Sequence, residues 1–399
     1  MQEVAEFRMP RSVLYGRNSL EKLGEQSKKL GKRAFIVSDT IMEKLGYVER
    51  CVKQLNAKGV TVITYNKVNA EPTNIHVLEA LSICKEGKCD FIIGIGGGSC
   101  IDAAKAVAVL YTNGGEIEEY VQNSIEIKHD PLPLIAIPTT SGTGSEVTSV
   151  AVITNKKTDV KMMIKHPSFT PQLAIIDPIL TSSVPPHITA ATGIDALCHA
   201  IEAYISKVSQ PLTDVLALSA IESIMKYLRF AYEDGDNMEA REALMIASLQ
   251  AGIAFSNASV TLVHGMSRPV GALFHVPHGI SNAILLPTVL EFTKMNAVKK
   301  LAEVGRSLNK DLYSYSDEEV ANYTIAEIQK LCFDLRIPNL REYGIDEGEF
   351  ENAISKMAKD AIASGSPSNN PRVPSYDEIK ELYRKCFDYQ YKITTRVIF

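Results

Sequence analysis

The chain changes its pattern of hydrophobic residues at about residue 180, and this change limits the fold more than any other feature. Before it, short runs rich in β-branched residues alternate with stretches of helix length at about 41–58, 74–88 and 100–112. Strands that alternate with helices in this way are typical of a parallel, doubly wound sheet. The runs that we expect to form its strands are Arg33–Asp39, Val60–Tyr65, Asp90–Gly96 and Pro133–Pro138.

Beyond Ile176–Pro178 the strand signal fades and helical periodicity replaces it. Capping-box sequences that begin at Ser316 and Ser375 predict the starts of further helices, and the turn-rich stretch 364–371 predicts a loop. We therefore expect a Rossmann-like, doubly wound α/β domain over residues 1–184 and an all-helical domain over residues 185–399, with the boundary near 180–187. The expected helical segments are 188–206, 211–233, 238–257 and 281–293.

One carboxylate and three histidines of the second half suggest a metal site. Asp195 and His199 are four residues apart, so on a helix they lie on one face. His264 and His278 follow downstream, each next to a glycine. One oxygen and three nitrogens suit a divalent metal such as Zn²⁺ or Fe²⁺. The alternative is an ordinary surface pair, which is the commoner role of a single Asp-x-x-x-His, so other parts of the chain must decide.

A glycine loop follows the third expected strand. Gly96, Gly97 and Gly98 precede Ser99 and a helix that carries Asp102. Glycines let the backbone approach a phosphate closely, and the free N–H groups of a helix start can bind it. The loop departs from the Gly-x-Gly-x-x-Gly fingerprint because serine occupies the third position. A tight strand-to-helix turn is the alternative.

A second loop, Pro138–Glu146, follows the fourth expected strand and is dense in hydroxyl groups and glycine. It has the groups to bind a pyrophosphate or a ribose, although a plain Ser/Thr turn has the same composition. Ligands of open α/β sheets bind at the carboxyl ends of the strands, where both loops lie. Asp39, at the end of the first expected strand, can accept hydrogen bonds from ribose and would repel a 2′-phosphate, which favours NAD over NADP. A helix N-cap at Asp39 explains the residue equally well.

The charge balance and the cysteines limit which partners and which cellular compartment we expect for this chain. Lys and Arg number 42 against 47 acidic residues, a net charge of -5, so no basic excess attracts nucleic acid or an anionic membrane. The first six residues lack the basic start and apolar core of a signal peptide, and no apolar run reaches membrane-spanning length. Seven scattered cysteines without a Cys-x-x-Cys fit reduced thiols. We expect a cytoplasmic protein that binds neither nucleic acid nor membrane.

Four motifs in this order resemble the iron-containing (group III) alcohol dehydrogenase family over nearly the whole chain. They are Gly96-Gly-Gly-Ser-x-x-Asp102, Pro138-Thr-Thr-x-Gly-Thr-Gly-Ser-Glu146, Gly193-x-Asp-Ala-Leu-x-His199, and His264-Gly-Met followed by Pro277-His-Gly279.

The resemblance implies an enzyme that transfers a hydride between NAD(H) and a small primary alcohol, diol or aldehyde, in a cleft between the two domains. It further implies a homodimer or larger assembly with N-terminal strands crossing between subunits. The metal, usually Fe²⁺ and sometimes Zn²⁺, acts as a Lewis acid on the substrate oxygen. By resemblance, Asp195, His199, His264 and His278 are the metal ligands, and the cofactor-binding residues are Asp39, Gly97, Gly98, Ser99, Asp102, Thr139, Thr140, Thr143 and Lys161.

One position departs from the family pattern. Many relatives carry a histidine four residues after the third ligand, where it is thought to move protons, but this chain has Arg268. Arginine stays charged and cannot act as a base near neutral pH. We therefore consider His275 as the proton relay beside His278, with a structural or cleft-lining role for His275 as the alternative. Lys161 has a plain alternative too, an exposed strand lysine.

Two other enzyme classes compete with this interpretation. A lyase of the dehydroquinate-synthase type and a glycerol(-phosphate) dehydrogenase use related chemistry, but a phosphorylated substrate needs several cationic groups. The segment 251–257 is mostly apolar or neutral, and Arg268 is one candidate cation. A non-enzymatic binding protein would not need both metal ligands and two phosphate loops.

Overall fold

The computed structural model describes residues 4–69, 71–121, 125–158 and 160–391, which form two compact units. Residues Arg8–Val184 make up an α/β unit. The chain from Pro185 onward makes up a helical unit, and the segment that ends at Phe7 groups with it. Gln210 Nε2 donates to the carbonyl of Glu6 at 3.0 Å, which ties that segment to the helical unit rather than to the α/β unit assumed from the sequence.

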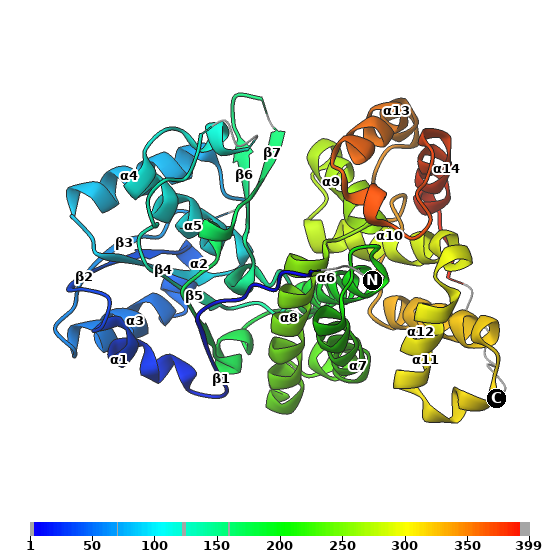
Figure 1. The fold of residues 1–399 in the computed structure, drawn as a ribbon, viewed down its shortest axis with the longest axis horizontal. Helices are drawn as coiled ribbons and strands as arrows, with labels where there is room; N and C mark the ends of the chain where they lie inside the picture. Colours follow the sequence, from blue (N-terminus) through cyan, green and yellow to red (C-terminus); the bar gives the residue numbers. More distant parts are fainter. Residues whose placement is uncertain (1–3, 70, 122–124, 159, 392–399) are drawn as a thin grey trace. The chain divides into compact units, whose positions relative to one another are not determined.

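The α/β unit is built on a parallel six-stranded sheet in the order β1-β8-β5-β4-β2-β3, with helices on both faces (Figure 1). Its doubly wound class is as predicted. The strands are β1 (Ser12–Tyr15), β2 (Arg33–Val37), β3 (Thr61–Tyr65), β4 (Phe91–Gly96), β5 (Leu134–Pro138) and β8 (Leu173–Ile176), and the helices are α1 (Leu23–Ser27), α2 (Thr40–Lys44), α3 (Tyr47–Asn56), α4 (Asn74–Glu86) and α5 (Gly98–Asn113).

Alternate residues of the strands fill two separate cores, because successive strand side chains point to opposite faces. Phe35 and Val37 pack with the residues of α4 and α5. Ala34 and Ile36 pack with the residues of α1 and α3. A sheet covered on both faces explains why its strands read as continuous apolar runs.

Three features of this unit differ from the prediction. The expected helix over 41–58 is two helices, α2 and α3, because Gly46 adopts a left-handed conformation (φ 76°) between them. Strands β1 and β8 were not expected. Nor was an antiparallel hairpin of β6 (Val150–Asn155) and β7 (Val160–Lys165), which forms a separate two-stranded sheet.

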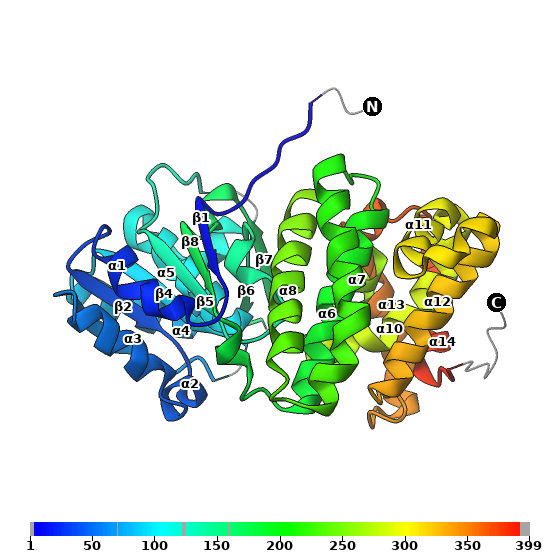
Figure 2. The same cartoon turned by 90° about the horizontal axis from the view of Figure 1, so that it is seen from below.

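The helices of the helical unit (Figure 2) pack around a large apolar core, and Ala302, Leu312 and Val320 form a smaller cluster beside it. The capping boxes at Ser316 and Ser375 are present as predicted. The predicted loop 364–371 includes one 3₁₀ turn, η8 (Ser366–Asn369). The helices are α6 (Pro186–Ile205), α7 (Pro211–Glu233), α8 (Met238–Ala258), α9 (Leu262–Phe274), α10 (His278–Thr293), α11 (Val298–Leu308), α12 (Asp317–Asp334), α13 (Glu347–Ala363) and α14 (Tyr376–Phe387).

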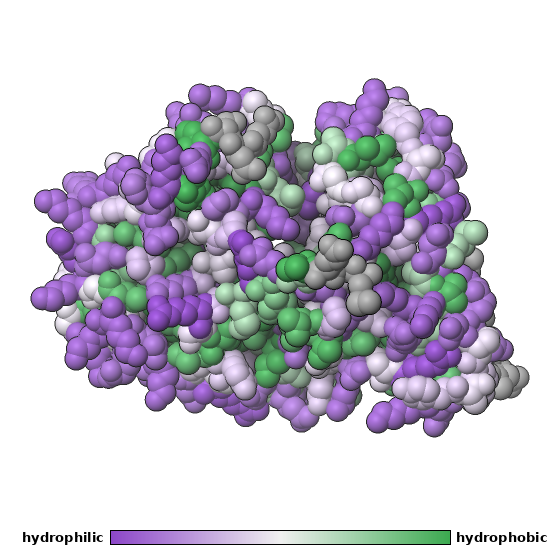
Figure 3. Space-filling model, in the orientation of Figure 1, coloured by the Kyte–Doolittle hydropathy of each residue, from purple (hydrophilic) through white to green (hydrophobic). Residues whose placement is uncertain are grey.

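Hydrophilic residues cover most of the outer surface of each unit in the view of Figure 3. Within the described ranges, no single helix is long and apolar enough to cross a membrane, and α8 and α9 meet that test only as a pair bent by 102°. Buried polar residues point more directly to function than single exposed apolar residues do. The informative ones here are Lys105, Glu146, Asp195, His199, Glu202, His264 and Asn282.

Candidate metal centre and cofactor-binding loops

Helix α6 supplies three polar side chains to the interior of the helical unit. Asp195, His199 and Glu202 are spaced i, i+4 and i+7, so they share one face of the helix. Each is at most 4% exposed. The helix begins with Pro186, whose fixed φ suits a first turn and whose missing N–H costs nothing there. The three side chains therefore project together from the buried side of α6.

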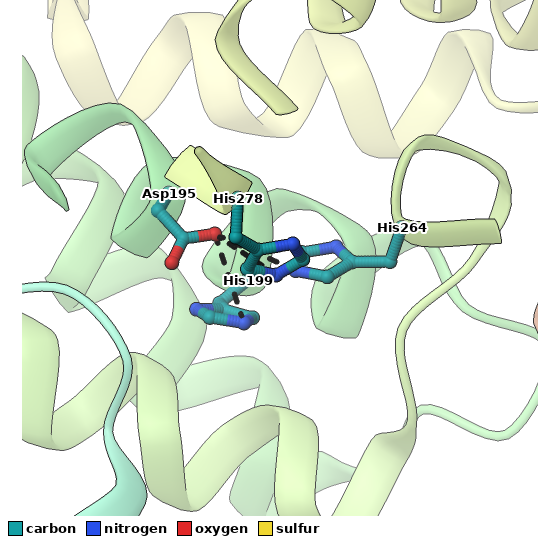
Figure 4. A group of neighbouring side chains, drawn as sticks. All are labelled: Asp195, His199, His264 and His278. Atoms are coloured by element: carbon teal, nitrogen blue, oxygen red, sulfur yellow. Dashed lines mark ion pairs between the residues drawn. The ribbon is translucent and has the colours of Figure 1, made fainter. Parts of the chain in front are cut away.

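His264, in the first turn of α9, and His278, the first residue of α10, complete the group (Figure 4). One ligand atom from each of the four residues lies within 4.8 Å of all the others. Asp195 Oδ1 is 4.0 Å from His199 Nε2, 3.6 Å from His264 Nε2 and 3.8 Å from His278 Nε2. The structure thus brings together all four residues that the sequence singled out.

The separations fit a small divalent cation. Tetrahedral ligands about 2.1 Å from an ion lie about 3.4 Å apart, so the donors need to contract only slightly. One carboxylate oxygen and three imidazole nitrogens suit iron(II) or zinc(II). The side chain of His278 is 38% exposed while the others are at most 5% exposed, so the group is open on one side. Catalytic metal sites keep such an open position for the substrate.

Glu202 fixes the orientation of His264. Its carboxylate accepts hydrogen bonds from Thr261 Oγ1 at 2.8 Å, from Val263 N at 2.6 Å and from His264 Nδ1 at 2.5 Å. With Nδ1–H donated to Glu202, Nε2 of His264 faces Asp195 and the other imidazoles, and its lone pair becomes free for a metal when the ring loses its second proton. Sequence reasoning missed Glu202, although its position three residues after His199 places it on the ligand face of α6.

Ring stacking orients His199. Its ring lies against Phe255 of α8 with centroids 4.1 Å apart and an interplanar angle of 14°. On the other side it stacks on His264, with centroids 4.5 Å apart. The ring therefore cannot turn without disturbing two neighbours, and its Nε2 stays directed at Asp195.

The electrostatics of the group favour bound positive charge. Burial raises the pKa of Asp195, but His199, His278 and His264 together outweigh burial and hold that pKa below its usual range. Burial likewise lowers the pKa of His264, yet Glu202 and Asp195 outweigh it and raise the pKa to about 9. Two buried carboxylates thus stabilise a cation at this place, whether a proton or a metal ion.

In the α/β unit, the glycine loop leads from β4 into α5. Gly97 is the N-cap of α5 and provides no side-chain cap, so the first N–H groups of the helix have no side-chain acceptor. Gly96 has φ 144°, and a Cβ at Gly98 would lie 2.9 Å from Thr143 Oγ1. Side chains are therefore excluded here by backbone conformation and by close approach, and the N–H groups remain available to an anion.

The two loops lie side by side, because β4 and β5 are neighbouring parallel strands. Thr139 N donates to the carbonyl of Gly96 at 3.0 Å, and the Thr139 side chain is buried. Thr140 and Thr143 are partly exposed beside Gly97 and Gly98. The sequence-predicted cofactor residues of the two loops, including the partly exposed Ser99, therefore form one continuous edge of the unit.

Lys105, on α5, is buried, and the side chain of Asp102 on the same helix is only 13% exposed. Asp102 accepts hydrogen bonds from Ser145 Oγ at 2.5 Å and from Val152 N at 2.9 Å. Lys105 Nζ donates to Thr148 Oγ1 at 3.0 Å and to the carbonyl of Val150 at 2.6 Å, and it lies 3.7 Å from Asp102 Oδ1. The carboxylate of Asp102, predicted as a cofactor contact, is therefore engaged by the unit itself.

Burial has the largest effect on the pKa values of this cluster. It raises the pKa of Asp102, raises that of Glu146 to about 7 and lowers that of Lys105 to about 8. The charged forms of Asp102 and Lys105 are held by hydrogen bonds that fasten the second loop and the β6–β7 hairpin to α5.

Asp39 caps a helix and also faces the glycine loop. Its Oδ1 accepts from Ile41 N at 2.7 Å and Met42 N at 2.8 Å, which confirms the N-cap interpretation. Its Oδ2 accepts from Cys100 Sγ at 3.4 Å, one residue beyond the loop. The ribose contact stays a prediction, and the position of Oδ2 is compatible with it.

Three further residues of interest have different surroundings. Lys161 Nζ pairs with Glu71 Oε1 at 2.6 Å on the hairpin, and its side chain is 22% exposed. His275 is exposed at the end of α9 with φ 55°, and it forms no hydrogen bond or ion pair within the described part of the chain. Arg268 Nη1 donates to Ser366 Oγ at 3.2 Å. None of these contacts tests the predicted roles of Lys161 and His275.

Comparison with known proteins gives consistent matches along the chain. A family model described as iron-containing alcohol dehydrogenase matches residues 10–178, and a model of the C-terminal part of the same family matches residues 189–387. An NADPH-dependent butanol dehydrogenase of Clostridium saccharobutylicum is 36% identical, covering 96% of this chain and 98% of that protein. An NAD-dependent methanol dehydrogenase of Bacillus methanolicus is 35% identical, covering 95% and 99%. The crystal structure of a 1,3-propanediol oxidoreductase superposes with a TM-score of 0.92 at 36% identity, covering 96% of this chain and all of that one.

Proposed function

The chain belongs to the iron-containing alcohol dehydrogenase family, and from this premise we propose that it transfers a hydride between NAD(H) and a small primary alcohol, diol or aldehyde. The observation that carries the proposal is the convergence of one carboxylate and three imidazoles inside the helical unit. The lyase and the glycerol(-phosphate) dehydrogenase are not favoured by the relatives, which are named alcohol dehydrogenases.

In this proposal Asp195, His199, His264 and His278 hold an iron(II) ion, or zinc(II), which has the same ligand preferences. When bound, the ion supplies Lewis acidity toward the substrate oxygen. Asp195 contributes the negative charge, and Glu202 keeps the Nε2 lone pair of His264 directed inward. The exposed side of His278 is where a small alcohol or aldehyde approaches. His275, in the connection that precedes His278, is the proposed proton relay.

The cofactor residues of the proposal lie on the α/β unit. The N–H groups of Gly97, Gly98 and Ser99 bind the pyrophosphate, and Thr139, Thr140 and Thr143 line it from the second loop. The Asp39 carboxylate accepts hydrogen bonds from the hydroxyl groups of the adenosine ribose. It would repel the 2′-phosphate of NADP. Lys161 contacts the cofactor from the hairpin, and Asp102 acts by fastening the second loop. NAD(H) supplies the hydride chemistry, and these residues orient it.

The test is an absorbance assay at 340 nm with anaerobically purified protein, NAD, and a panel of alcohols that includes propan-1-ol and 1,3-propanediol. Net NADH formation and an equimolar iron or zinc content support the proposal. A lyase would use NAD without net reduction. Asp195→Ala and His264→Ala should lose most of the metal and the activity, whereas His187→Ala, an exposed histidine on the same helix α6, should keep both. Wild-type turnover by both ligand variants without added metal would refute the metal mechanism.

We also infer a reducing, cytoplasmic location and a homodimer or larger assembly. The seven cysteines are buried free thiols, which suits a reducing compartment. Strand β1 is at the edge of the six-stranded sheet and Tyr15 is 67% exposed, so this edge can pair with another copy. Light scattering of the purified protein tests the assembly, and a monomer would refute it.

A further inference from the structure

The turn that joins α4 to β4 brings two cysteine side chains together. Cys89 N donates to the carbonyl of Cys84 at 3.2 Å. Lys88 N donates to the carbonyl of Lys85 at 3.1 Å, and Lys88 has a left-handed φ of 48°. These two bonds and this φ define a Schellman motif, in which the side chains of the two residues joined by the outer bond often pack together. At the end of α4 both of those residues are cysteines.

The two thiols are in contact in the reduced protein. Cys84 is fully buried, Cys89 is 3% exposed, and the Cys84 thiol donates a hydrogen bond to the Cys89 sulfur. A disulfide requires the two sulfur atoms to approach from this contact to about 2.05 Å. Lys85, Glu86 and Lys88, which lie between the cysteines in the sequence, are exposed. The pair therefore lies directly beneath the surface, within reach of a small molecule from solvent.

The surroundings make Cys89 the more reactive thiol of the two. The hydrogen bond from Cys84 lowers the pKa of Cys89, and Arg33 acts in the same direction, against the effects of burial and of Asp90. The same hydrogen bond, together with burial, raises the pKa of Cys84. Because the thiolate is the nucleophile in cysteine chemistry, Cys89 reacts first with an oxidant and Cys84 reacts second.

We propose that Cys84 and Cys89 form a dithiol site that hydrogen peroxide converts into a reversible disulfide. The Cys89 thiolate attacks one peroxide oxygen and the O–O bond breaks. Cys89 becomes a sulfenic acid, and the other oxygen takes up a proton and leaves as water. The sulfur of Cys84 then attacks the sulfur of Cys89, the S–O bond breaks, and the hydroxyl group leaves as a second water with the proton of Cys84. Peroxide thus accepts the two electrons that the thiols lose, and a small thiol restores both by exchange.

The second thiol gives the site a protective role. A sulfenic acid that persists is oxidised further to a sulfinic acid, which small thiols do not reverse. Because Cys84 contacts Cys89 before oxidation, the disulfide forms without a large movement of the turn. Transient disulfides of this kind occur among otherwise reduced cytoplasmic thiols. The site lies in the α/β unit and does not depend on the metal function proposed for the helical unit.

The test maps the cysteines of the full-length protein after treatment with excess peroxide. Zinc is supplied in place of iron, because zinc(II) has no redox chemistry of its own. Free thiols are alkylated before unfolding, and trypsin then cleaves after Lys85 and Lys88, so a disulfide joins two peptides that reduction separates. Cys84→Ala and Cys89→Ala each remove one thiol. Cys51→Ala is the matched control, since Cys51 is a fully buried thiol on α3 of the same unit. Thermal unfolding of the reduced variants reports on folding.

We expect the joined peptides in the wild-type protein and in Cys51→Ala, and their separation by dithiothreitol. Cys84→Ala should accumulate the sulfenic acid of Cys89, which dimedone traps, and then its sulfinic acid. In Cys89→Ala the oxidation of Cys84 should be about tenfold slower or more, because its thiol stays protonated. Absence of the joined peptides from the wild-type protein would overturn the proposal. So would a Cys89 that stays reduced in Cys84→Ala, since no sulfenic acid would then be available for Cys84 to attack.

Discussion

Replacing Glu202 by glutamine should weaken metal binding, and most strongly at high pH. The carboxylate accepts hydrogen bonds from Thr261, Val263 and His264, and glutamine preserves its size while removing the charge and one acceptor oxygen. Carboxylates that hold a metal-ligating histidine in this way contribute roughly 10–100-fold in metal affinity. The expected loss is therefore about 1.4–2.7 kcal/mol once the histidine is free of its proton.

Protonation makes this loss depend on pH. Against the effect of burial, Glu202 and Asp195 raise the pKa of His264 to about 9, so below that pH a metal ion must displace a proton. Each pH unit below about 9 then costs the wild-type protein about tenfold in apparent affinity. Without the Glu202 charge the pKa of His264 falls, and the proton competes less. The deficit of Glu202→Gln should therefore be largest above the pKa of His264 and shrink toward neutral pH.

Zinc dissociation constants, measured with a competing chelator at a series of pH values from neutral to above the pKa of His264, test both parts of this expectation. Glu303→Gln is the matched control, because Glu303 is a carboxylate of the same helical unit that pairs with Tyr204 and not with a ligand. A deficit that does not vary with pH would refute the proton competition. The absence of any deficit would show that Glu202 does not support His264.

Three further outcomes are expected. Burial raises the pKa of Glu146 from 4.5 to about 7, so the folded chain keeps a proton that the unfolded chain releases. Its contribution to stability is then full below pH 4.5 and is lost as pH rises through about 7. Glu146→Gln should reduce this pH-dependent decline in the free energy of unfolding by about 3 kcal/mol. Denaturant unfolding curves recorded at a series of pH values measure the change. Asp39→Gly should raise kcat/KM for NADP relative to NAD, and an unchanged ratio would exclude Asp39 from the ribose site. His275→Ala should lower turnover and shift its pH profile, whereas unchanged turnover and profile would exclude a relay.

The parts of the fold that the sequence predicts are those in which local pattern and tertiary packing agree. Strands β2, β4 and β5 are apolar runs buried along almost their whole length, and they appear where expected. Strand β3 also appears where expected, although it is at the edge of the sheet and partly exposed. Helix α9 was not predicted, because Gly265, Pro269 and Gly271 all have low helix propensity. It is helical since its residues pack into the core of the helical unit, which no local pattern reveals. Strand β1 depends on a partner, β8, from the far end of the same unit.

The same distinction applies to the metal centre. Asp195 and His199 can be paired from their spacing, whereas His264 and His278 come from other helices, and only residue type and family resemblance connected them to α6. Glu202 carried a spacing signal, but a glutamate on a helix face is usually solvated, so the signal had no weight before burial was known. Burial, not spacing, identifies the residue that supports a ligand.

Burial also explains why the two cofactor loops act as one structure. Asp102 lies on α5, the helix that the glycine loop begins, and it accepts a hydrogen bond from Ser145 at the end of the second loop. Lys105, one turn later, holds Thr148 and Val150 beyond that loop. Burying such charges is expensive, and an apolar core of the same volume is often at least as stable. Stability alone therefore does not account for them. Directional hydrogen bonds fix the second loop to α5, the helix whose N-terminus is the proposed phosphate site. Apolar contacts would fix the loop less specifically.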